Sequence, residues 1–138
     1  MPRYTRLIRP GMILHVTARG NYRQAVFYAA EDHQKYLGLL ERYSGEFDLT
    51  LLGWCLMTNH VHLLVRSEGF DSLALTMKRT QSEYACYVNR RHHRASGHLW
   101  QSRFYSCPVE GPYVWMALRY IELNPVRAKL ASSPEDYS

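Results

Sequence analysis

Residues 49–66 of the chain read LTLLGWCLMTNHVHLLVR, and this stretch decides the fold. Leu49 to Met57 is an apolar run of the kind that forms a strand, and His60 to Arg66 is a second such run. Only the polar pair Thr58-Asn59 separates them, so the stretch predicts a β-hairpin.

The flanks of the hairpin carry further strand and helix patterns. Residues 12–18 (MILHVTA) are largely apolar and predict a strand that ends at Arg19-Gly20-Asn21. Residues 31–46 place apolar side chains at helical spacing and predict a helix. On the other side of the hairpin, Asp71-Ser72 is a candidate cap for a long helix over residues 73–91.

The C-terminal third adds one strand and one helix. A polar loop at residues 92–98 precedes an apolar run at 99–109, which predicts a fourth strand interrupted at Ser102-Arg103. A last helix is predicted over residues 112–123, because proline is tolerated in the first turn. Asn124-Pro125 is expected to end it, since the residue before proline disfavours the α region.

The order of these elements is β-α-β-β-α-β followed by a helix. It predicts an α+β fold, a ferredoxin-like antiparallel sheet with an additional C-terminal helix that carries Tyr120. The chain has 138 residues, of which 46% are apolar, enough for one core. We therefore expect residues 1–138 to form a single domain.

The composition limits the binding partners and the cellular compartment that we expect. The net charge of +5 and the pI near 9.2 favour a polyanionic partner such as nucleic acid, with a mildly basic protein as the plainer alternative. Three cysteines without a CxxC pair fit a reducing compartment. No apolar run approaches the roughly 20 residues of a membrane helix, and the N-terminus lacks the apolar segment of a signal peptide. We expect a cytoplasmic protein without a membrane partner.

Two histidines stand out within the hairpin. His60 and His62 are separated by one residue on a strand, so both side chains project from the same face, while Val61 projects from the other. Two neighbouring imidazoles can share a metal ion. The alternative is a pair of histidines hydrogen-bonded to water on an open sheet face. Histidine-triad hydrolases would need a third histidine where Leu64 stands, which disfavours that class.

The last predicted helix contains Tyr120 and Asn124, four residues apart and therefore on one face. A phenol is a weak nucleophile at neutral pH, because its ordinary pKa is about 10, and a nearby metal would help it to react. Core packing is the alternative for Tyr120, one of 11 tyrosines. For Asn124 the alternative is capping a short terminal helix that starts at Asn124-Pro125.

Several motifs occur together and in order along the chain. They resemble the single-tyrosine HUH transposases of small bacterial insertion sequences, and in particular the REP-associated tyrosine transposases. The resemblance extends from about Pro10 to Leu130. It is carried by residues 15–21 (HVTARGN), 56–64 (LMTNHVHLL), 99–104 (LWQSRF) and 119–128 (RYIELNPVRA).

The resemblance implies a set of site residues and an activity. His60 and His62 would ligate Mg²⁺ or Mn²⁺, Asn124 would complete the metal site, and Tyr120 would be the nucleophile. The protein would recognise hairpin DNA and cut and rejoin single strands through a 5′-phosphotyrosine intermediate, in transposition or REP-element processing. Relatives include monomers and homodimers, and a DNA-bound form would associate with the nucleoid.

Basic residues are the expected phosphate contacts, although each has a solvated surface position as its alternative. Trp100 and Tyr105 could stack on unpaired bases, with core packing as the alternative. The predicted DNA-binding residues are Arg19, Arg23, Lys78, Arg79, Arg90, Arg91, Arg94 and Arg103.

Two other functions fit parts of the pattern. The chain could be a domesticated transposase that binds hairpin DNA without cutting it. It could also be a metal-dependent phosphohydrolase of nucleotides, which would use water as the nucleophile and form no covalent adduct. The presence of His60, His62 and Tyr120 together favours the strand-transferring enzyme.

Overall fold

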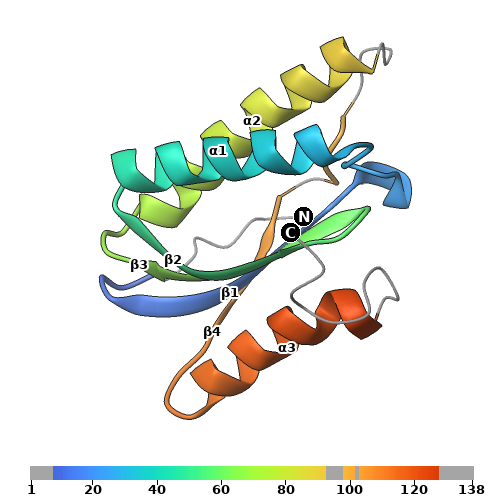
Figure 1. The fold of residues 1–138 in the computed structure, drawn as a ribbon. Helices are drawn as coiled ribbons and strands as arrows, with labels where there is room; N and C mark the ends of the chain where they lie inside the picture. The colour runs from blue at the N-terminus through green and yellow to red at the C-terminus, as the bar shows by residue number, and fades with distance from the viewer. Residues whose placement is uncertain (1–7, 93–97, 102, 128–138) are drawn as a thin grey trace.

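The structure, a computed structural model, describes residues 8–92, 98–101 and 103–127, with side chains described as far as Ile121. The described part of the chain forms one sheet with helices on both of its faces (Figure 1). In chain order the elements are β1 (Met12–Arg19), a short 3-10 turn η1 (Asn21–Arg23), α1 (Ala30–Glu46), β2 (Leu49–Leu56), β3 (His60–Ser67), α2 (Ser72–Arg91), β4 (Tyr105–Pro108) and α3 (Tyr113–Arg127).

The strand order is β2-β3-β1-β4, and each neighbouring pair is antiparallel. Figure 1 shows α1 and α2 side by side on one face of the sheet and α3 on the other. The fold is therefore the predicted α+β architecture with one added helix. No helix in the described ranges is both long and apolar enough to cross a membrane.

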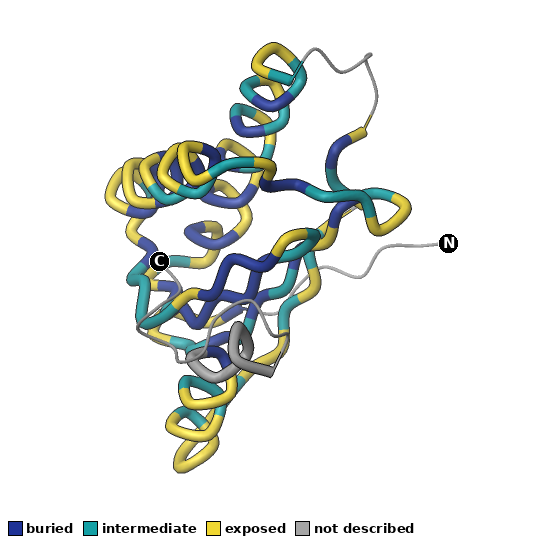
Figure 2. The backbone as a smooth tube through the Cα atoms, turned by 45° about the vertical axis from the view of Figure 1, so that its right-hand side comes forward, coloured by how far each residue is buried: buried dark blue, intermediate teal, exposed yellow. Residues whose placement is uncertain are grey.

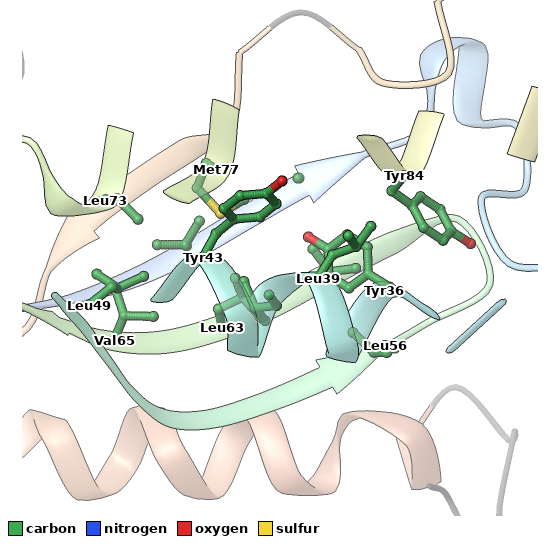
Figure 3. Packing of buried hydrophobic residues seen from close by; sticks show 14 of the residues in the cluster. Tyr36, Leu39, Tyr43, Leu49, Leu56, Leu63, Val65, Leu73, Met77 and Tyr84 are labelled. Carbon is green, nitrogen blue, oxygen red and sulfur yellow. The ribbon is translucent and has the colours of Figure 1, made fainter. Parts of the chain in front are cut away.

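The face beneath α1 and α2 holds the main hydrophobic core. Val61, Leu63 and Val65 of β3 are fully buried there, at 0% exposure, as the two-residue repeat of a strand requires. Figure 3 shows tyrosines and leucines of α1 meeting side chains of β2, β3 and α2 in this layer. Figure 2, coloured by burial, shows dark blue segments of the sheet at the centre of the molecule, and β3 is buried over most of its length. We call this the closed face of the sheet.

The opposite face, which we call the open face, carries a smaller cluster. Cys55, Met57 and Leu64 pack there against Ile121 of α3, which lies on β2 and β3. Gly53 permits this approach, since a Cβ at that position would lie 2.6 Å from Cδ1 of Leu118 on α3. The helix α3 contacts β2 and β3, and Ile13 of β1 also packs against this cluster.

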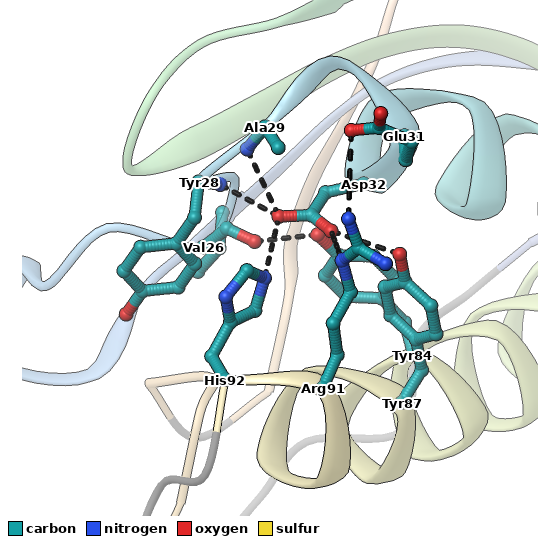
Figure 4. Close-up of polar contacts among 9 residues, drawn as sticks. All are labelled: Val26, Tyr28, Ala29, Glu31, Asp32, Tyr84, Tyr87, Arg91 and His92. Carbon is teal, nitrogen blue, oxygen red and sulfur yellow. Dashed lines mark hydrogen bonds and ion pairs between the residues drawn. The ribbon is translucent and has the colours of Figure 1, made fainter.

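A buried carboxylate ties the two helices of the closed face together (Figure 4). Asp32 is 0% exposed near the start of α1 and receives hydrogen bonds from both helical regions. The donors are the backbone nitrogens of Tyr28 (2.8 Å) and Ala29 (3.1 Å), the Tyr87 hydroxyl (2.9 Å) and Nε2 of His92 (2.9 Å). Arg91 lies 3.4 Å from the same carboxylate. The start of α1 is thereby fixed to the end of α2.

Most predicted elements are confirmed, including the hairpin around Thr58-Asn59 and both long helices. The fourth strand, predicted over residues 99–109, is wrong in extent. Only Tyr105–Pro108 pairs as a strand, and Trp100 makes a single isolated bridge with Gly20. The described residues of this run therefore contact the segment around β1 at two separate places.

The predicted end of the last helix is also wrong. The helix α3 continues through Asn124 and Pro125 to Arg127. A proline removes one donor and disfavours a helical residue before it, but this preference is probable rather than absolute, and here only the last turn is affected. Asn124 is therefore within a helix and does not start a new one, so the capping alternative is excluded.

Candidate active site

The two histidines of the hairpin project from the open face, as predicted. His60 and His62 alternate along β3 with Val61 and Leu63, which are buried on the closed face. Their ring centroids lie 4.8 Å apart with the ring planes nearly perpendicular. His62 is buried at 7% exposure, and His60 is half-buried. The structure thus brings the two predicted metal ligands into contact.

A third histidine, which is not among the predicted site residues, lies beside this pair. His15 of β1 projects from the same face, and its Nε2 lies 3.1 Å from Nδ1 of His62. Thr17, the register partner of His62 on β1, places its hydroxyl oxygen 3.4 Å from the same nitrogen. The usable signal was the same-face alternation of His15 and Thr17, but pairing β1 with β3 requires the tertiary register.

Tyr120 lies above this cluster on α3. Its ring centroid is 6.0 Å from that of His62 and 6.4 Å from that of His15, with edge-to-face geometry in both cases. The side chain is 41% exposed. A single chain therefore brings Tyr120 to its own histidine pair, with one side of the phenol open to solvent.

In both His60 and His62, the ring nitrogen that takes part in a hydrogen bond is Nδ1. Nδ1 of His60 lies 2.8 Å from Oδ1 of Asn59, and Nδ1 of His62 faces His15 and Thr17. Among the described residues, no hydrogen bond involves Nε2 of either ring. An imidazole that donates through Nδ1 keeps a lone pair on Nε2, which is the arrangement of a metal-bound histidine with a supporting partner.

The surroundings keep these imidazoles neutral near pH 7. Burial, followed by the charges of His60, His15 and Arg19, lowers the pKa of His62 to about 3. Burial and Arg19 also lower the pKa of His60, and burial lowers the pKa of His15. Neutral imidazole is the form that binds a metal ion, so the donors suit a cation.

A metal site here would need ligands beyond the described histidine pair. No group of three His, Cys, Asp or Glu side chains in the described ranges is arranged to hold an ion. Asn124, the predicted third ligand, lies one helical turn after Tyr120 on α3, and its side chain is outside the described residues. The two neutral nitrogen donors therefore fit part of a divalent-cation site.

The predicted DNA-binding residues are spread over several surfaces. Arg19 is exposed at the end of β1 opposite His60, beside the site. Arg79 pairs with Glu83 at 3.8 Å, and Arg91 pairs with Glu31 and Asp32, so these two side chains have structural partners. Arg90 is exposed on α2, and Arg94 lies outside the described residues.

Lys78 and Arg103 come together at a pocket of about 390 Å³ between α2 and the segments 100–101 and 103–104, on the side of the closed face. Trp100 and Phe104 also line it. The indole of Trp100 packs near Tyr36 and Tyr84 and donates to the Gln81 carbonyl at 3.2 Å, which favours core packing for one side of its ring. Tyr105, in contrast, is 68% exposed on β4.

A strained turn lies next to His60. Tyr22 and Arg23 of η1 have positive φ angles of 54° and 59°, a backbone region that side chains disfavour. Both side chains are exposed, and the Arg23 carbonyl accepts from Asn59 at 3.4 Å. The turn presents a predicted phosphate-binding residue, Arg23, and an aromatic ring beside the hairpin loop.

Two solved structures share this fold. A REP-associated tyrosine transposase bound to a REP hairpin aligns with a TM-score of 0.78 and 18% identity, over 99% of this chain and 80% of that one. A protein of Deinococcus radiodurans R1 with a provisional assignment as a transposase aligns with a TM-score of 0.54 and 19% identity, over 88% of this chain and 96% of that one.

No curated protein matches the chain. The family model described as "Transposase IS200 like" matches residues 9–124, which include β1, the histidine hairpin and the tyrosine helix. Since this match covers most of the chain and agrees with the fold, the protein belongs to the IS200-like transposase family.

Proposed function

We propose that the protein is a hairpin-specific endonuclease and strand transferase of single-stranded DNA, with Tyr120 as its nucleophile. The observation that carries this proposal is the approach of the Tyr120 ring to 6.0 Å from His62 within one chain. Core packing alone does not account for a tyrosine that is 41% exposed above a cluster of three imidazoles. Family membership supports the same reaction class.

The reaction conserves the number of phosphoester bonds. The Tyr120 oxygen loses its proton and attacks phosphorus, so an O–P bond to tyrosine forms while the bond from phosphorus to the 3′ oxygen breaks. The 3′ oxygen leaves and takes up a proton, which gives a free 3′-OH and a 5′-phosphotyrosine. A second 3′-OH can later attack this phosphotyrosine and displace Tyr120, so strands are rejoined without an external energy source.

His60 and His62 would hold Mg²⁺ or Mn²⁺ through Nε2, and Asn124 would add an oxygen ligand. When bound, the cation neutralises charge on the scissile phosphate and promotes ionisation of a nearby phenol. Imidazole nitrogen is a softer donor than the oxygens that Mg²⁺ prefers, so Mn²⁺ is the ion for the first tests. The chain's own contribution is to orient both imidazoles and to exclude water around His62.

The decisive experiment incubates the protein and Mn²⁺ with 5′- or 3′-labelled oligonucleotides that fold into imperfect hairpins with single-stranded flanks. We expect the protein to be joined covalently to the 5′ phosphate of the fragment 3′ of the cut, so that the 3′-labelled oligonucleotide carries its label into the adduct. We expect Tyr120→Phe to abolish this adduct. Tyr113→Phe, on the same helix but seven residues away, is the matched control. Adduct formation by Tyr120→Phe at the wild-type level would reject the nucleophile assignment.

The within-chain distance further leads us to propose that one chain completes its own site, so a monomer is sufficient. Mixing the His62→Ala and Tyr120→Phe variants tests this point. Because neither chain has a complete site of its own, no adduct is expected. An adduct in the mixture alone would establish that Tyr120 serves a partner's histidines, and the site would then need a dimer.

Two results would support the other functions. Tight hairpin binding without any adduct or cleavage would indicate a domesticated DNA-binding protein. Cleavage by water, with no tyrosine adduct in wild type, would indicate a phosphohydrolase.

The proposal includes a DNA contact away from Tyr120. Lys78 and Arg103 line one pocket, whereas Arg79 and Arg91 are engaged by carboxylates. Two cations beside an aromatic wall suit a phosphate and its neighbouring base. We therefore assign Lys78 and Arg103 as the first pair to test among the predicted DNA-binding residues.

A further inference from the structure

We propose that His15 is a positioning residue for the metal site: its Nε2 accepts a hydrogen bond from Nδ1–H of His62 and so fixes His62 in the tautomer that leaves Nε2 able to bind a cation. This inference rests on the proposed function, because it assigns a role toward the same ion. It concerns a side chain that would not itself touch the metal.

The geometry identifies the atoms. Nε2 of His15 and Nδ1 of His62 are 3.1 Å apart, which is within hydrogen-bond range for two nitrogens, and the ring planes are inclined by only 25° with centroids 5.3 Å apart. Only one of two facing imidazole nitrogens can carry the shared proton. The choice of donor therefore decides which nitrogen of His62 is left with a lone pair.

The hydrogen-bond partner of His60 indicates which of the two facing nitrogens carries the proton. Oδ1 of Asn59 can only accept, so Nδ1 of His60 must donate, and Nε2 of His60 keeps its lone pair. For His62 to offer Nε2 to the same ion, its Nδ1 must donate as well, and the acceptor is then His15. The second nitrogen of a histidine sets the tautomer of the first in this way.

The position of His15 explains why β1 carries a histidine here. Cross-strand register pairs Thr17 with His62 and His15 with Leu64, so His15 reaches diagonally across the open face to His62. Thr17 is the competing acceptor, but its oxygen is 3.4 Å away, and a contact of that length is weaker than one of 3.1 Å. We assign the main contact to His15.

The first test reads the tautomer directly in the metal-free protein, by long-range ¹H–¹⁵N NMR of labelled histidines near pH 8. Wild type is expected to show His62 protonated at Nδ1. His15→Ala should move His62 toward the Nε2-protonated form, while His15→Gln, which retains an oxygen acceptor, should preserve the wild-type tautomer. A wild-type His62 protonated at Nε2 would overturn the proposal, as would no change in His15→Ala.

The second test measures binding of Mn²⁺ alone by titration calorimetry or electron paramagnetic resonance. His15→Ala should weaken binding about 10- to 100-fold, the usual effect of losing a supporting partner, and His15→Gln should restore most of it. Thr17→Val is the matched control and should leave both the tautomer and the affinity near wild type. If Thr17→Val moves them and His15→Ala does not, Thr17 is the acceptor and the proposal is wrong.

These readouts separate this inference from the proposed function. The tautomer is measured without metal or DNA, so it can follow the expected pattern even if no tyrosine adduct ever forms. Conversely, a Tyr120-dependent adduct can form while His62 keeps its tautomer in His15→Ala. That result would support the proposed nuclease activity and reject the role of His15. Thermal unfolding of each variant identifies any loss of folding.

Discussion

The two faces of the sheet differ in what they bury. On the closed face, Leu63 and its neighbours pack into a continuous apolar layer under α1 and α2. On the open face, His15 and His62 meet beneath Tyr120, and α3 covers only part of the surface. Adjacent residues of β3 therefore belong to different environments. The comparison teaches that stability and chemistry can be separated by a single step along one strand.

A cluster of neutral imidazoles is an inefficient way to stabilise a fold. Burying polar groups is unfavourable unless each is hydrogen-bonded, and His62 has its pKa lowered to about 3 mainly because it is buried. Apolar burial on the closed face of the same strands compensates for this unfavourable free energy. We expect each face to respond to mutation in its own way.

The largest contrast should come from neighbouring residues of β3. Leu63→Ala is expected to lower the free energy of unfolding by about 2–5 kcal/mol, because it leaves a cavity in the main core. His62→Ala should lower it by about 1 kcal/mol or less, since the histidine gains little from burial. Chemical denaturation of both variants measures the difference.

Addition of Mn²⁺ should distinguish Leu63→Ala from His62→Ala in the opposite sense, because only the His62 variant loses a metal ligand. Added Mn²⁺ should raise the melting temperature of wild type and of Leu63→Ala, because a ligand stabilises the folded state that binds it. It should leave His62→Ala unchanged. Equal stability losses in the two variants, or an equal Mn²⁺ response, would remove the distinction between the faces.

A smaller effect is expected from Asp32, the buried carboxylate that joins α1 to α2 on the closed face. Burial would raise the pKa of Asp32, but hydrogen bonds from the Tyr28 backbone, Tyr87 and His92 outweigh it and hold the pKa below its ordinary value of 3.8. Because the folded pKa is the lower one, the carboxylate stabilises the fold fully above pH 3.8. This contribution is lost as the pH falls from 3.8 through the folded pKa.

Asp32→Asn should therefore cost about 2–3 kcal/mol at pH 7, as expected for lost hydrogen bonds to a charged group. Its stability should also depend less on pH between about 5 and 2 than that of wild type. Denaturation midpoints across this range provide the measurement. Asp48→Asn, at an exposed position, is the control. Parallel pH curves for wild type and Asp32→Asn would contradict the role given to this carboxylate.

The smallest expected effect concerns DNA binding near the closed face. Lys78→Ala and Arg103→Ala should each reduce the salt dependence of hairpin binding by about one unit of the log–log slope, with little change in stability. Fluorescence anisotropy with a labelled hairpin oligonucleotide over several salt concentrations measures this slope. Arg42→Ala, an exposed cation on α1 outside the pocket, is the control and should not change it. An equal slope change in all three would indicate general charge attraction.

Much of the fold was predictable because its signals are local. The hairpin around Thr58-Asn59 followed from two apolar runs, and the shared face of His60 and His62 followed from the period of a strand. The errors arose where distant contacts compete with local preference. The run at 99–109 pairs only over Tyr105–Pro108, and α3 passes through Pro125. The single-domain organisation of residues 1–138 and the catalytic roles stay predictions.

The sequence by itself determined which residues share a strand face or a helix face, since those relations depend on backbone periods alone. It thereby supplied His60 and His62 as candidates, whereas Tyr120 came from the resemblance to a known family. Only the tertiary structure decided that β1 pairs with β3 and brings His15 to His62, and that α3 docks on the same face. The contact of His15 with His62 joins residues 47 positions apart, and these contacts depend on register and packing, which no local pattern encodes.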